Sequence, residues 1–553
     1  MKNVEKYQPL YYMPPEEHTG WVKQDRITKA PIWCSVDLRD GNQALITPMS
    51  LDEKLKYYKF LLGIGFKEIE VGFPAASETE YAFMRTLIDD NLIPEGVSIQ
   101  VLTQSRAHII EKTFAAIKGA PRAIMHLYNS TSFAQRQQVF KLSEDEIIAI
   151  AEEGARLFDK CASAMPETKF TFEYSPESFT GTEMEFALRI CNAVIDVWKP
   201  CEARPVIINL PATVESSMPH VYAQQIAYMS RHLRYREHVI VSLHPHNDRG
   251  TAVAAAELGL LAGAQRVEGT ILGNGERTGN VDLVTLALNL YTHGVDPGID
   301  LSDMPHIVNT YEEATALSVS PRHPYAGGLV FAAFSGSHQD AIAKGMQYRK
   351  ERGENLWTVP YLPLDPSDVN REYEADVIRI NSQSGKGGIS YILENNFGYQ
   401  LPKELKQEVG YFIKDISDRE HKELTPHEIL DAFTIGYVNI SEPIFMGAVD
   451  WQRDGDRTVA YVTLAVEGKR RQVTGKGNGS LDAVSQALRS EMEFSFKSYA
   501  QHALETDSDA RAAAYVKIHD KTGKPVWGVG VHNDITMASV LALVSAVNRG
   551  LES

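Results

Sequence analysis

Two histidines separated by one residue, His244 and His246, directly follow an apolar run at residues 239–243. That run is rich in β-branched residues and is typical of a buried parallel strand. Because successive side chains of a strand leave opposite faces, both imidazoles share a face and can reach one metal ion. Imidazole suits Zn, Mn, Fe or Co, and carboxylate partners would shift the preference toward Mg or Mn. A polar loop with two solvated histidines is the alternative, because short His motifs have many chance matches.

Two residues that could supply oxygen ligands, Asp40 and Asn280, lie near the two ends of the strand-rich part of the sequence. Asp40 follows the first strand-like run and Asn280 follows the last. In a closed barrel the last strand lies beside the first, so we predict that Asp40, His244, His246 and Asn280 bind a divalent metal ion. The remaining coordination positions would stay open for water or substrate. The alternatives are an Asx turn before Gly41 for Asp40 and a helix N-cap for Asn280.

These residues belong to a repeating pattern of strands and helices. Segments such as 51–63 and 142–157 carry the 3.6-residue apolar spacing of helices. Eight β-rich runs over about 240 residues match the size and strand count of a (β/α)8 TIM barrel. A doubly wound open sheet is the competing architecture, and the eightfold repeat favours the barrel. The runs are residues 32–36, 68–72, 98–102, 123–127, 170–174, 206–210, 239–243 and 266–271.

Polar and ionisable side chains follow nearly every run. Active sites of such barrels lie at the C-terminal ends of the strands, so these side chains are expected to converge on one rim. Arg39 is suited to neutralise a developing enolate or carbonyl oxygen, or it is a surface arginine paired with a carboxylate. Gly273 and Gly275 belong to a glycine-rich loop whose N–H groups, with the dipole of a following helix, could hold the phosphates of a nucleotide-like cofactor. The loop lacks the Lys-Ser/Thr ending of a P-loop.

Composition limits the class of protein. The 553 residues suggest several domains, and the net charge of −17 argues against nucleic-acid binding through a general basic surface. No run of about 18 apolar residues occurs, and the first residues lack the apolar core of a secretory signal. The four cysteines form no CxxC pair, which is typical of reduced thiols. We therefore expect a cytoplasmic protein without a membrane span.

We divide the chain into four parts. They are an N-terminal extension at 1–30, the catalytic barrel at 31–295, a linker with helical subdomains at 296–430, and a C-terminal α+β domain at 431–553. Two strand–glycine–helix patterns follow one another in the last part, which indicates an internal duplication. The first has three predicted strands before Gly477-Asn478-Gly479, and the second has two, at 512–519 and 526–531, before a helix capped near Asn533. Such loops can bind an amino acid through free N–H groups, or the part is a dimerisation or folding module without a ligand.

Three motifs resemble the signatures of the metal-dependent Claisen-condensing and aldolase-like barrels. They lie at residues 38–43, 244–248 and 273–280. Three further segments, at 174–178, 334–342 and 359–366, resemble the long form of the 2-isopropylmalate synthase family in particular. The resemblance covers nearly the whole chain, and no motif position departs from the pattern.

The resemblance implies a TIM barrel, a helical linker region and a C-terminal α+β regulatory domain. It also implies an acyltransferase that condenses acetyl-CoA with 2-oxoisovalerate to give 2-isopropylmalate and CoA, the first committed step of leucine biosynthesis. The implied cofactor is a divalent metal, with Mg, Mn and Zn all open and a monovalent cation such as K also open. A homodimer and feedback inhibition by leucine are implied as well, with coupling through the linker.

The resemblance also assigns roles to single residues. Asp40, His244, His246 and Asn280 match the metal ligands, Arg39 the support for the enolate oxygen, and Glu177 an acid/base or polarising carboxylate. His338 and Tyr361, contributed across the dimer, match a candidate base and a residue that orients the hydrolytic water. The residues matched to the oxo acid are Leu102, His126, Ser175, Pro211 and Thr213, and those matched to acetyl-CoA are Gly273 and Gly275. For the implied leucine site, the strand–glycine–helix pattern gives the candidates Gly477, Asn478, Gly479, Gly530 and Asn533.

Other functions fit parts of this pattern. A citramalate or homocitrate synthase would use pyruvate or 2-oxoglutarate, and pocket discrimination by one or two methylenes is worth only about 1–3 kcal/mol. A lyase on the same barrel would cleave a C–C bond without needing the C-terminal module. A non-catalytic amino-acid sensor would keep the barrel only as a scaffold. The intact set of Arg39, Glu177 and the four predicted ligands argues against the sensor.

Overall fold

The computed structural model describes residues 6, 8–333, 335–353, 355–373, 386–420, 424–466, 468–504 and 510–552. Phe334, part of one motif above, lies outside the described residues. The chain forms two compact units, Met1–Val330 with Leu364–Arg371, and Phe331–Pro363 with Glu372–Ser553. Among the described helices, none combines the length and apolarity that crossing a bilayer requires.

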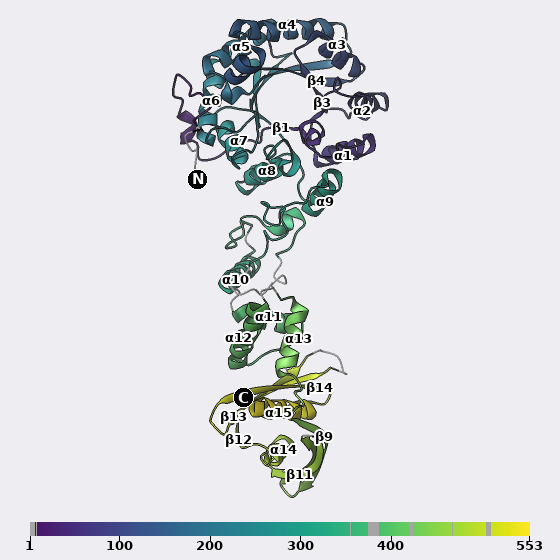
Figure 1. The fold of residues 1–553 in the computed structure, drawn as a ribbon, viewed down its shortest axis with the longest axis vertical. Helices are drawn as coiled ribbons and strands as arrows, with labels where there is room; N and C mark the ends of the chain where they lie inside the picture. The colour runs from purple at the N-terminus through teal and green to yellow at the C-terminus, as the bar shows by residue number, and fades with distance from the viewer. Residues whose placement is uncertain are drawn as a thin grey trace. The chain divides into compact units, whose positions relative to one another are not determined.

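The first unit contains a closed barrel of eight parallel strands, surrounded by helices (Figure 1). The last strand pairs with the first, from Ile32 opposite Arg266 to Ser35 opposite Gly269. This closure confirms the predicted barrel and excludes the open sheet. The strands are β1 (Ile32–Ser35), β2 (Glu68–Gly72), β3 (Ser98–Gln104), β4 (Arg122–Ser130), β5 (Lys169–Glu177), β6 (Val206–Ala212), β7 (Val239–Pro245) and β8 (Arg266–Gly269).

Each strand is followed by a helix on the outside of the barrel (Figure 1). Ser50 and Ser143 begin two of these helices with capping boxes that include Glu53 and Glu146, so local sequence fixes where the helices start. The helices are α1 (Leu51–Ile64), α2 (Glu78–Asp89), α3 (Ala107–Ala116), α4 (Glu144–Ser163), α5 (Met184–Trp198), α6 (Pro219–His232), α7 (Ala252–Leu261) and α8 (Leu283–Thr292), with α9 (Met304–Thr315) after the barrel.

The barrel interior is polar and charged. Arg266 is fully buried and donates to Glu68 at 2.6 Å, to Glu268 at 2.8 Å and to Gln100 at 2.6 Å. A buried charge requires such partners, because desolvation without them is unfavourable by several kcal/mol. The polar interior also explains why β4 and β5 run three residues beyond the predicted 127 and 174: polar side chains at their ends still face inward as strand residues.

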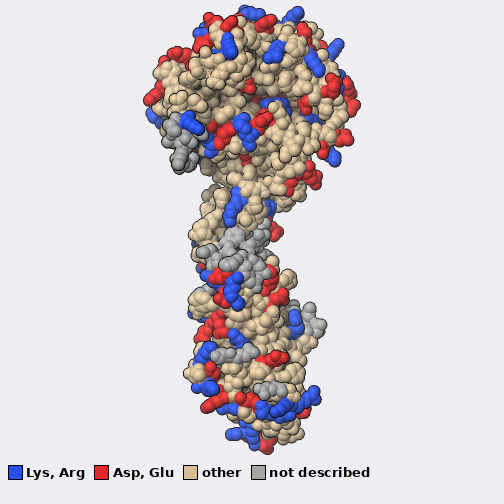
Figure 2. Space-filling model, viewed as in Figure 1, with Lys and Arg blue, Asp and Glu red and all other residues tan. Residues whose placement is uncertain are grey.

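Charged side chains on the outer surface of the barrel are mixed in sign. On the face drawn in Figure 2, acidic and basic side chains are interspersed over the barrel. The four cysteines, Cys34, Cys161, Cys191 and Cys201, are free. This agrees with the expectation of reduced thiols.

The second unit begins with helices and ends with two similar β-rich modules. The helices are α10 (Gly336–Arg352), α11 (Lys386–Asn395), α12 (Lys403–Glu420) and α13 (Pro426–Tyr437). The first module contains β9 (Ile444–Asp454), β10 (Arg457–Val466), β11 (Lys469–Gly477) and α14 (Ser480–Leu488), and the second contains β12 (Phe494–Ala503), β13 (Ala512–Asp520), β14 (Pro525–His532) and α15 (Ile535–Glu552). The sheets have the orders β11–β10–β9 and β12–β13–β14.

The two modules share one hydrophobic core. Val462 and Leu464 of the first module belong to the same buried cluster as Val516 and Leu543 of the second. The predicted duplication missed β12, so it gave the second module two strands instead of three. Along β12, buried Phe494 is followed by mostly exposed or half-buried positions, and such an edge strand lacks the apolar run used to find the others.

Candidate metal centre and active site

Three of the four predicted metal ligands lie together at the C-terminal ends of β7 and β1, the two strands that flank β8 in the barrel. His244 belongs to β7, His246 follows it, and Asp40 lies in one π-helical turn, η3 (Asp37–Gly41), directly after β1. Asp40 Oδ2 is 3.4 Å from His244 Nε2 and 3.7 Å from His246 Nε2. All three side chains are buried. Two imidazoles and a carboxylate at these separations form a donor set suited to a divalent cation.

Asn280, the fourth predicted ligand, lies beside His246. Its backbone forms an isolated bridge with His246, and its Nδ2 donates to the carbonyl of Asn274 at 3.1 Å. The buried Oδ1 has no hydrogen-bond partner within the described part of the chain. Since a buried acceptor is normally satisfied, this unpaired oxygen fits a metal ligand. The alternative role for Asn280, a helix N-cap, is wrong because Asp282 caps α8.

The charges around the three ligands favour a cation. Burial opposes ionisation, but the charges of Arg39 and His244 hold the pKa of Asp40 well below its usual range. Burial also opposes protonation of His244, but hydrogen bonds to Asp40 and Glu268 raise its pKa to about 9. Burial and the neighbouring His244 lower the pKa of His246 to about 4. A cation that binds here would therefore take over the position of a proton on His244.

Arg39 is held by carboxylates on two sides. Its Nη1 donates to Asp40 Oδ1 at 2.8 Å and its Nε donates to Glu70. The Arg39 side chain is only 12% exposed, so it is not a surface arginine. The other part of that alternative, pairing with carboxylates, is present. A guanidinium fixed in this way presents its charge at a constant position, which is what stabilisation of an oxyanion requires.

One cavity of about 270 Å³ collects most of the predicted barrel residues. Five residues that line it were not singled out from the sequence, although they lie in or next to the polar strand ends: Gln43, Tyr128, Asn209, Glu276 and Arg277. Gln43, Glu276 and Arg277 also lie within the motifs at 38–43 and 273–280, whereas Tyr128 and Asn209 had no signal besides their position at a strand end. The predicted residues that line the cavity are Arg39, Asp40, Leu102, His126, Ser175, Glu177, Pro211, Thr213, His244 and His246.

Hydrogen bonds fix the polar groups of this cavity. His126 bonds to Glu70 Oε2 through Nδ1 at 2.8 Å and to Ser175 Oγ through Nε2 at 2.7 Å. Glu177 accepts from Ser130 Oγ, and Thr213 Oγ1 accepts from the backbone N–H of residue 178 at 2.8 Å. These side chains are thus oriented before any substrate arrives.

The glycine loop after β8 is tightly folded. Gly273 and Gly279 have φ values of +78° and +96°, and a Cβ on Gly279 would overlap the carbonyl of Gly273. Asn274 Nδ2 donates to the carbonyl of Gly41 at 3.0 Å, so the loop is tied to the turn that carries Asp40. The expected helix dipole is not adjacent to Gly275, because α8 begins only at Leu283. Binding of phosphates by Gly273 and Gly275 stays a prediction.

His338 and Tyr361 belong to the second unit. Their rings stack on each other with centroids 4.0 Å apart and an interplanar angle of 25°. Tyr361 is 61% exposed, so it does not belong to a hydrophobic core. The structure therefore brings these two predicted residues together within their own unit.

The predicted regulatory residues have local structural roles. A Cβ on Gly477 or Gly530 would overlap the backbone of α14 or α15, respectively, so both glycines permit close helix–strand packing. The backbone N–H of Asn478 donates to Asp482 Oδ2 at 2.8 Å, and Gly479 is the N-cap of α14. Asn533 lines a cavity of about 790 Å³ with residues of α11, α13 and β14. Leucine binding by these residues stays a prediction.

The chain is similar to known proteins over nearly its full length. Family models match three segments: HMGL-like at 30–310, Alpha-isopropylmalate synthase post-catalytic domain-like at 328–394, and LeuA allosteric (dimerisation) domain at 425–551. The chain is 60% identical to a 2-isopropylmalate synthase of Desulfitobacterium hafniense over 99% of this chain and 98% of that protein. It is 56% identical to one of Helicobacter hepaticus over 98% and 99%.

Solved structures with similarity to the chain include two lyases of low sequence identity. An HMG-CoA lyase from Brucella melitensis is 16% identical, with a TM-score of 0.43, over 52% of this chain and 100% of that one. A hydroxymethylglutaryl-CoA lyase from Pseudomonas aeruginosa is 17% identical, with a TM-score of 0.43, over 53% and 95%.

Proposed function

Because the chain belongs to the 2-isopropylmalate synthase family, we propose that it condenses acetyl-CoA with 2-oxoisovalerate and releases 2-isopropylmalate and CoA. This makes it an acyltransferase of leucine biosynthesis. The observation that carries the proposal is the single cavity that gathers Arg39, Asp40, Glu177, His244 and His246 at the C-terminal rim of the barrel. Relatives at 48–60% identity over nearly the full length support the same reaction.

Asp40, His244, His246 and Asn280 are the residues that would hold a divalent metal ion. The unpaired Oδ1 of Asn280 and the close approach of Asp40 to both imidazoles support this assignment. A bound divalent ion would orient the 2-oxo acid and polarise its ketone toward attack. The mixed nitrogen and oxygen donors accept Mg, Mn or Zn, and a monovalent cation such as K is compatible with the same chemistry.

The chain's own groups supply charge and proton transfer in the cavity. Arg39, fixed by Asp40 and Glu70, stabilises the enolate oxygen of acetyl-CoA. Glu177, oriented by Ser130, is the acid/base or polarising carboxylate. Ser175 and Thr213 offer hydroxyls to the carboxylate or keto oxygen of the oxo acid. Gly273 and Gly275 are proposed to lie near the phosphates of acetyl-CoA.

The apolar part of the cavity supports a branched alkyl group. Leu102 and Pro211 line the cavity beside His126, and we assign them to the isopropyl end of 2-oxoisovalerate. Burial of apolar surface there would favour this substrate over pyruvate by about 1–3 kcal/mol.

The second unit is proposed to supply the remaining functions. In a homodimer, His338 would act as the base that deprotonates the acetyl group, and Tyr361 would orient the water that hydrolyses the thioester. The modules at 444–552 would bind leucine as an inhibitor, with Gly477, Asn478, Gly479, Gly530 and Asn533 near it. We also propose that the chain divides into four parts, with limits at residues 30, 295 and 430. We propose a cytoplasmic location for the protein.

Release of free thiol from acetyl-CoA tests the proposal. The full-length protein is assayed with 2-oxoisovalerate, pyruvate and 2-oxoglutarate, with and without a chelator, and with and without leucine. We expect release that is greatest with 2-oxoisovalerate, is abolished by the chelator and is reduced by leucine. Strong preference for pyruvate would assign citramalate synthesis instead, and no release with any oxo acid would leave only an amino-acid sensor.

A further inference from the structure

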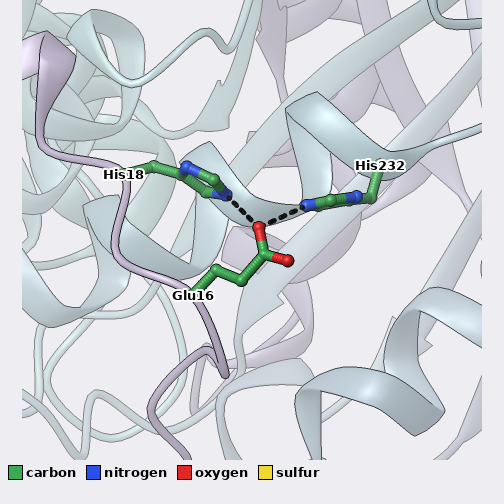
Figure 3. Close-up of side chains that lie close together, drawn as sticks. All are labelled: Glu16, His18 and His232. Carbon is green, nitrogen blue, oxygen red and sulfur yellow. Dashed lines mark ion pairs between the residues drawn. The ribbon is translucent and has the colours of Figure 1, made fainter.

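A second cluster of metal-binding side chain types lies away from the cavity. Glu16 and His18 come from the segment before β1, and His232 is the last residue of α6 (Figure 3). Because α6 runs back from the C-terminal end of β6 toward the start of β7, this cluster lies at the end of the barrel opposite the active site. We propose that Glu16, His18 and His232 bind a transition-metal cation such as Zn²⁺.

Two of the three donor separations match tetrahedral coordination, and all three donor atoms lie within 4.8 Å of one another. Glu16 Oε2 is 3.5 Å from His18 Nε2 and 3.4 Å from His232 Nε2, and both nitrogens face the same carboxylate oxygen (Figure 3). A tetrahedral ion with bonds of about 2.0–2.1 Å separates its ligands by about 3.4 Å. Two imidazoles and one carboxylate are a zinc donor set that leaves the fourth position to water. The 59% exposure of the Glu16 side chain leaves room for that water.

The Nε2 atoms of both histidines lack hydrogen-bond partners among the described residues. His18 Nε2 and His232 Nε2 are also shielded from solvent. A buried polar atom is normally paired with protein or ordered solvent, and a cation bound among the three donors would supply the missing partner of both nitrogens. An ordinary ion pair with Glu16 would satisfy the charge, but it leaves both nitrogens beyond good hydrogen-bond distance.

Packing holds the donors in position. The rings of His18 and Tyr228 stack with centroids 6.4 Å apart, and Tyr228 lies 4.7 Å from His232. Gln225 Nε2 donates to the carbonyl of Tyr12 at 2.9 Å, so the N-terminal segment is also tied to α6 independently of the cluster. A bound ion would therefore add a further link between this segment and the helix.

One neighbour opposes the ion. Arg231 Nη1 lies 3.4 Å from His18 Nδ1, and a donor at that position keeps the ring proton on Nε2. A ligating Nε2 must lose that proton, so metal binding has to move it to Nδ1 and displace Arg231. We expect Arg231→Gln to bind Zn²⁺ more tightly than the unsubstituted chain, because it removes both a competing donor and a positive charge.

Metal stoichiometry tests the site independently of activity. The chelator-stripped full-length protein is titrated with Zn²⁺ by calorimetry, and Co²⁺ absorption reports tetrahedral geometry. We expect His18→Ala and His232→Ala each to lose one equivalent per chain relative to the unsubstituted protein. The matched control is His238→Ala, since His238 pairs with Glu237 at 3.8 Å and is 30% exposed, close to the 31% of His232. This control should lose none.

A second comparison separates this site from the barrel. In a His244→Ala background, Zn²⁺ should still raise the melting temperature, and adding His18→Ala should abolish that rise. Circular dichroism of each variant checks that the barrel is folded. Unchanged Zn²⁺ stoichiometry in both His18→Ala and His232→Ala would overturn the proposed site. A single Zn²⁺ equivalent that disappears only with His244→Ala would overturn it as well. Neither result would contradict the proposed synthase function.

Discussion

Glu268 Oε2 lies 2.7 Å from His244 Nδ1, so a fully buried carboxylate accepts the hydrogen bond that turns the other imidazole nitrogen toward Asp40. Glu268 is itself fixed by Arg266, which donates to its other oxygen at 2.8 Å. A chain of buried charges thus sets the orientation of one proposed metal ligand before any ion binds.

Removal of this support should weaken metal binding. We expect Glu268→Gln to lower the affinity for the activating divalent ion by about 10–100-fold, because an amide orients and polarises His244 less well than a carboxylate. Equilibrium dialysis of the stripped protein measures the change. Glu68→Gln is the control, since Glu68 also contacts Arg266 but is 20% exposed and has no contact with His244 among those described. Equal affinities of Glu268→Gln and the unsubstituted protein would refute the role of Glu268.

The charge of Arg39 should matter to catalysis more than to folding. We expect Arg39→Gln to lower kcat for thiol release by about 10²–10³-fold, the range for loss of one oxyanion donor. Arg39→Lys keeps the charge but loses the planar fork that reaches Asp40 and Glu70, so its loss should be intermediate. Steady-state kinetics with both substrates varied would separate kcat from KM. A loss below about fivefold in Arg39→Gln, with an unchanged melting temperature, would contradict the assignment.

Asp37 should make stability depend on pH. Burial raises the pKa of Asp37 to about 7, although hydrogen bonds from Ser35, Ile271 and Tyr57 partly oppose the shift. A raised carboxyl pKa stabilises the fold below the unfolded value of 3.8, and that stability is lost as pH rises through 7. Between pH 5 and 8.5 the loss is at most about 3 kcal/mol.

We therefore expect the melting temperature of Asp37→Asn, relative to the unsubstituted protein, to improve between pH 5 and 8.5. The amide cannot ionise, so this variant escapes the loss. Asp89→Asn is the control, because Asp89 is 59% exposed in a surface pair with Arg85 and should show little trend. A difference for Asp37→Asn that does not change with pH would show that the carboxyl is already ionised at pH 5.

Packing and ligand binding can be separated in the C-terminal modules. We expect Gly477→Ala and Gly530→Ala each to destabilise the second unit by about 1–3 kcal/mol, because the added methyl overlaps the backbone of α14 or α15. Gly479→Ala meets no atom within 4 Å and should change stability by less than about 1 kcal/mol. Urea unfolding followed through the second unit measures these changes.

The same variants test regulation by leucine. If the loop binds the effector, Gly479→Ala or Asn478→Ala should reduce leucine inhibition of thiol release without lowering the unfolding midpoint. Inhibition that fails only in the destabilised Gly477→Ala and Gly530→Ala would instead assign both glycines to packing alone.

The barrel was predictable from the chain because its strands alternate regularly with amphipathic helices. The juxtaposition of Asp40 with His244 and His246 followed from closure, which places the first and last strands side by side. The polar interior was not predictable, because Glu70, Gln100 and the other buried groups look like surface residues in one dimension. Only the closed sheet brings Gln100 within 2.7 Å of both Glu70 and Glu268.

Strand limits and small structural roles were also beyond the sequence. Edge strand β12 has an irregular register with β13 between Phe496 and Ser498, and a bulge of this kind interrupts period-two alternation. Gly477 and Gly530 looked like ligand-loop glycines because φ and helix proximity cannot be read from spacing. Gln43 and Arg277 lie within the motifs at 38–43 and 273–280, but nothing in those motifs shows that their side chains line the cavity.

The hydrogen bonds that join η3 to the loop after β8 have a consequence for folding during synthesis. Asn274 to Gly41 and Ile271 to Asp37 are bonds between residues 233 and 234 positions apart. On the ribosome, Asp40 emerges long before Asn280 is synthesised, so a nascent chain lacks the complete set of metal donors until the final barrel strand has docked. Binding of the metal ion would therefore show that the barrel has closed. A barrel truncated at either end should lose high-affinity metal binding completely.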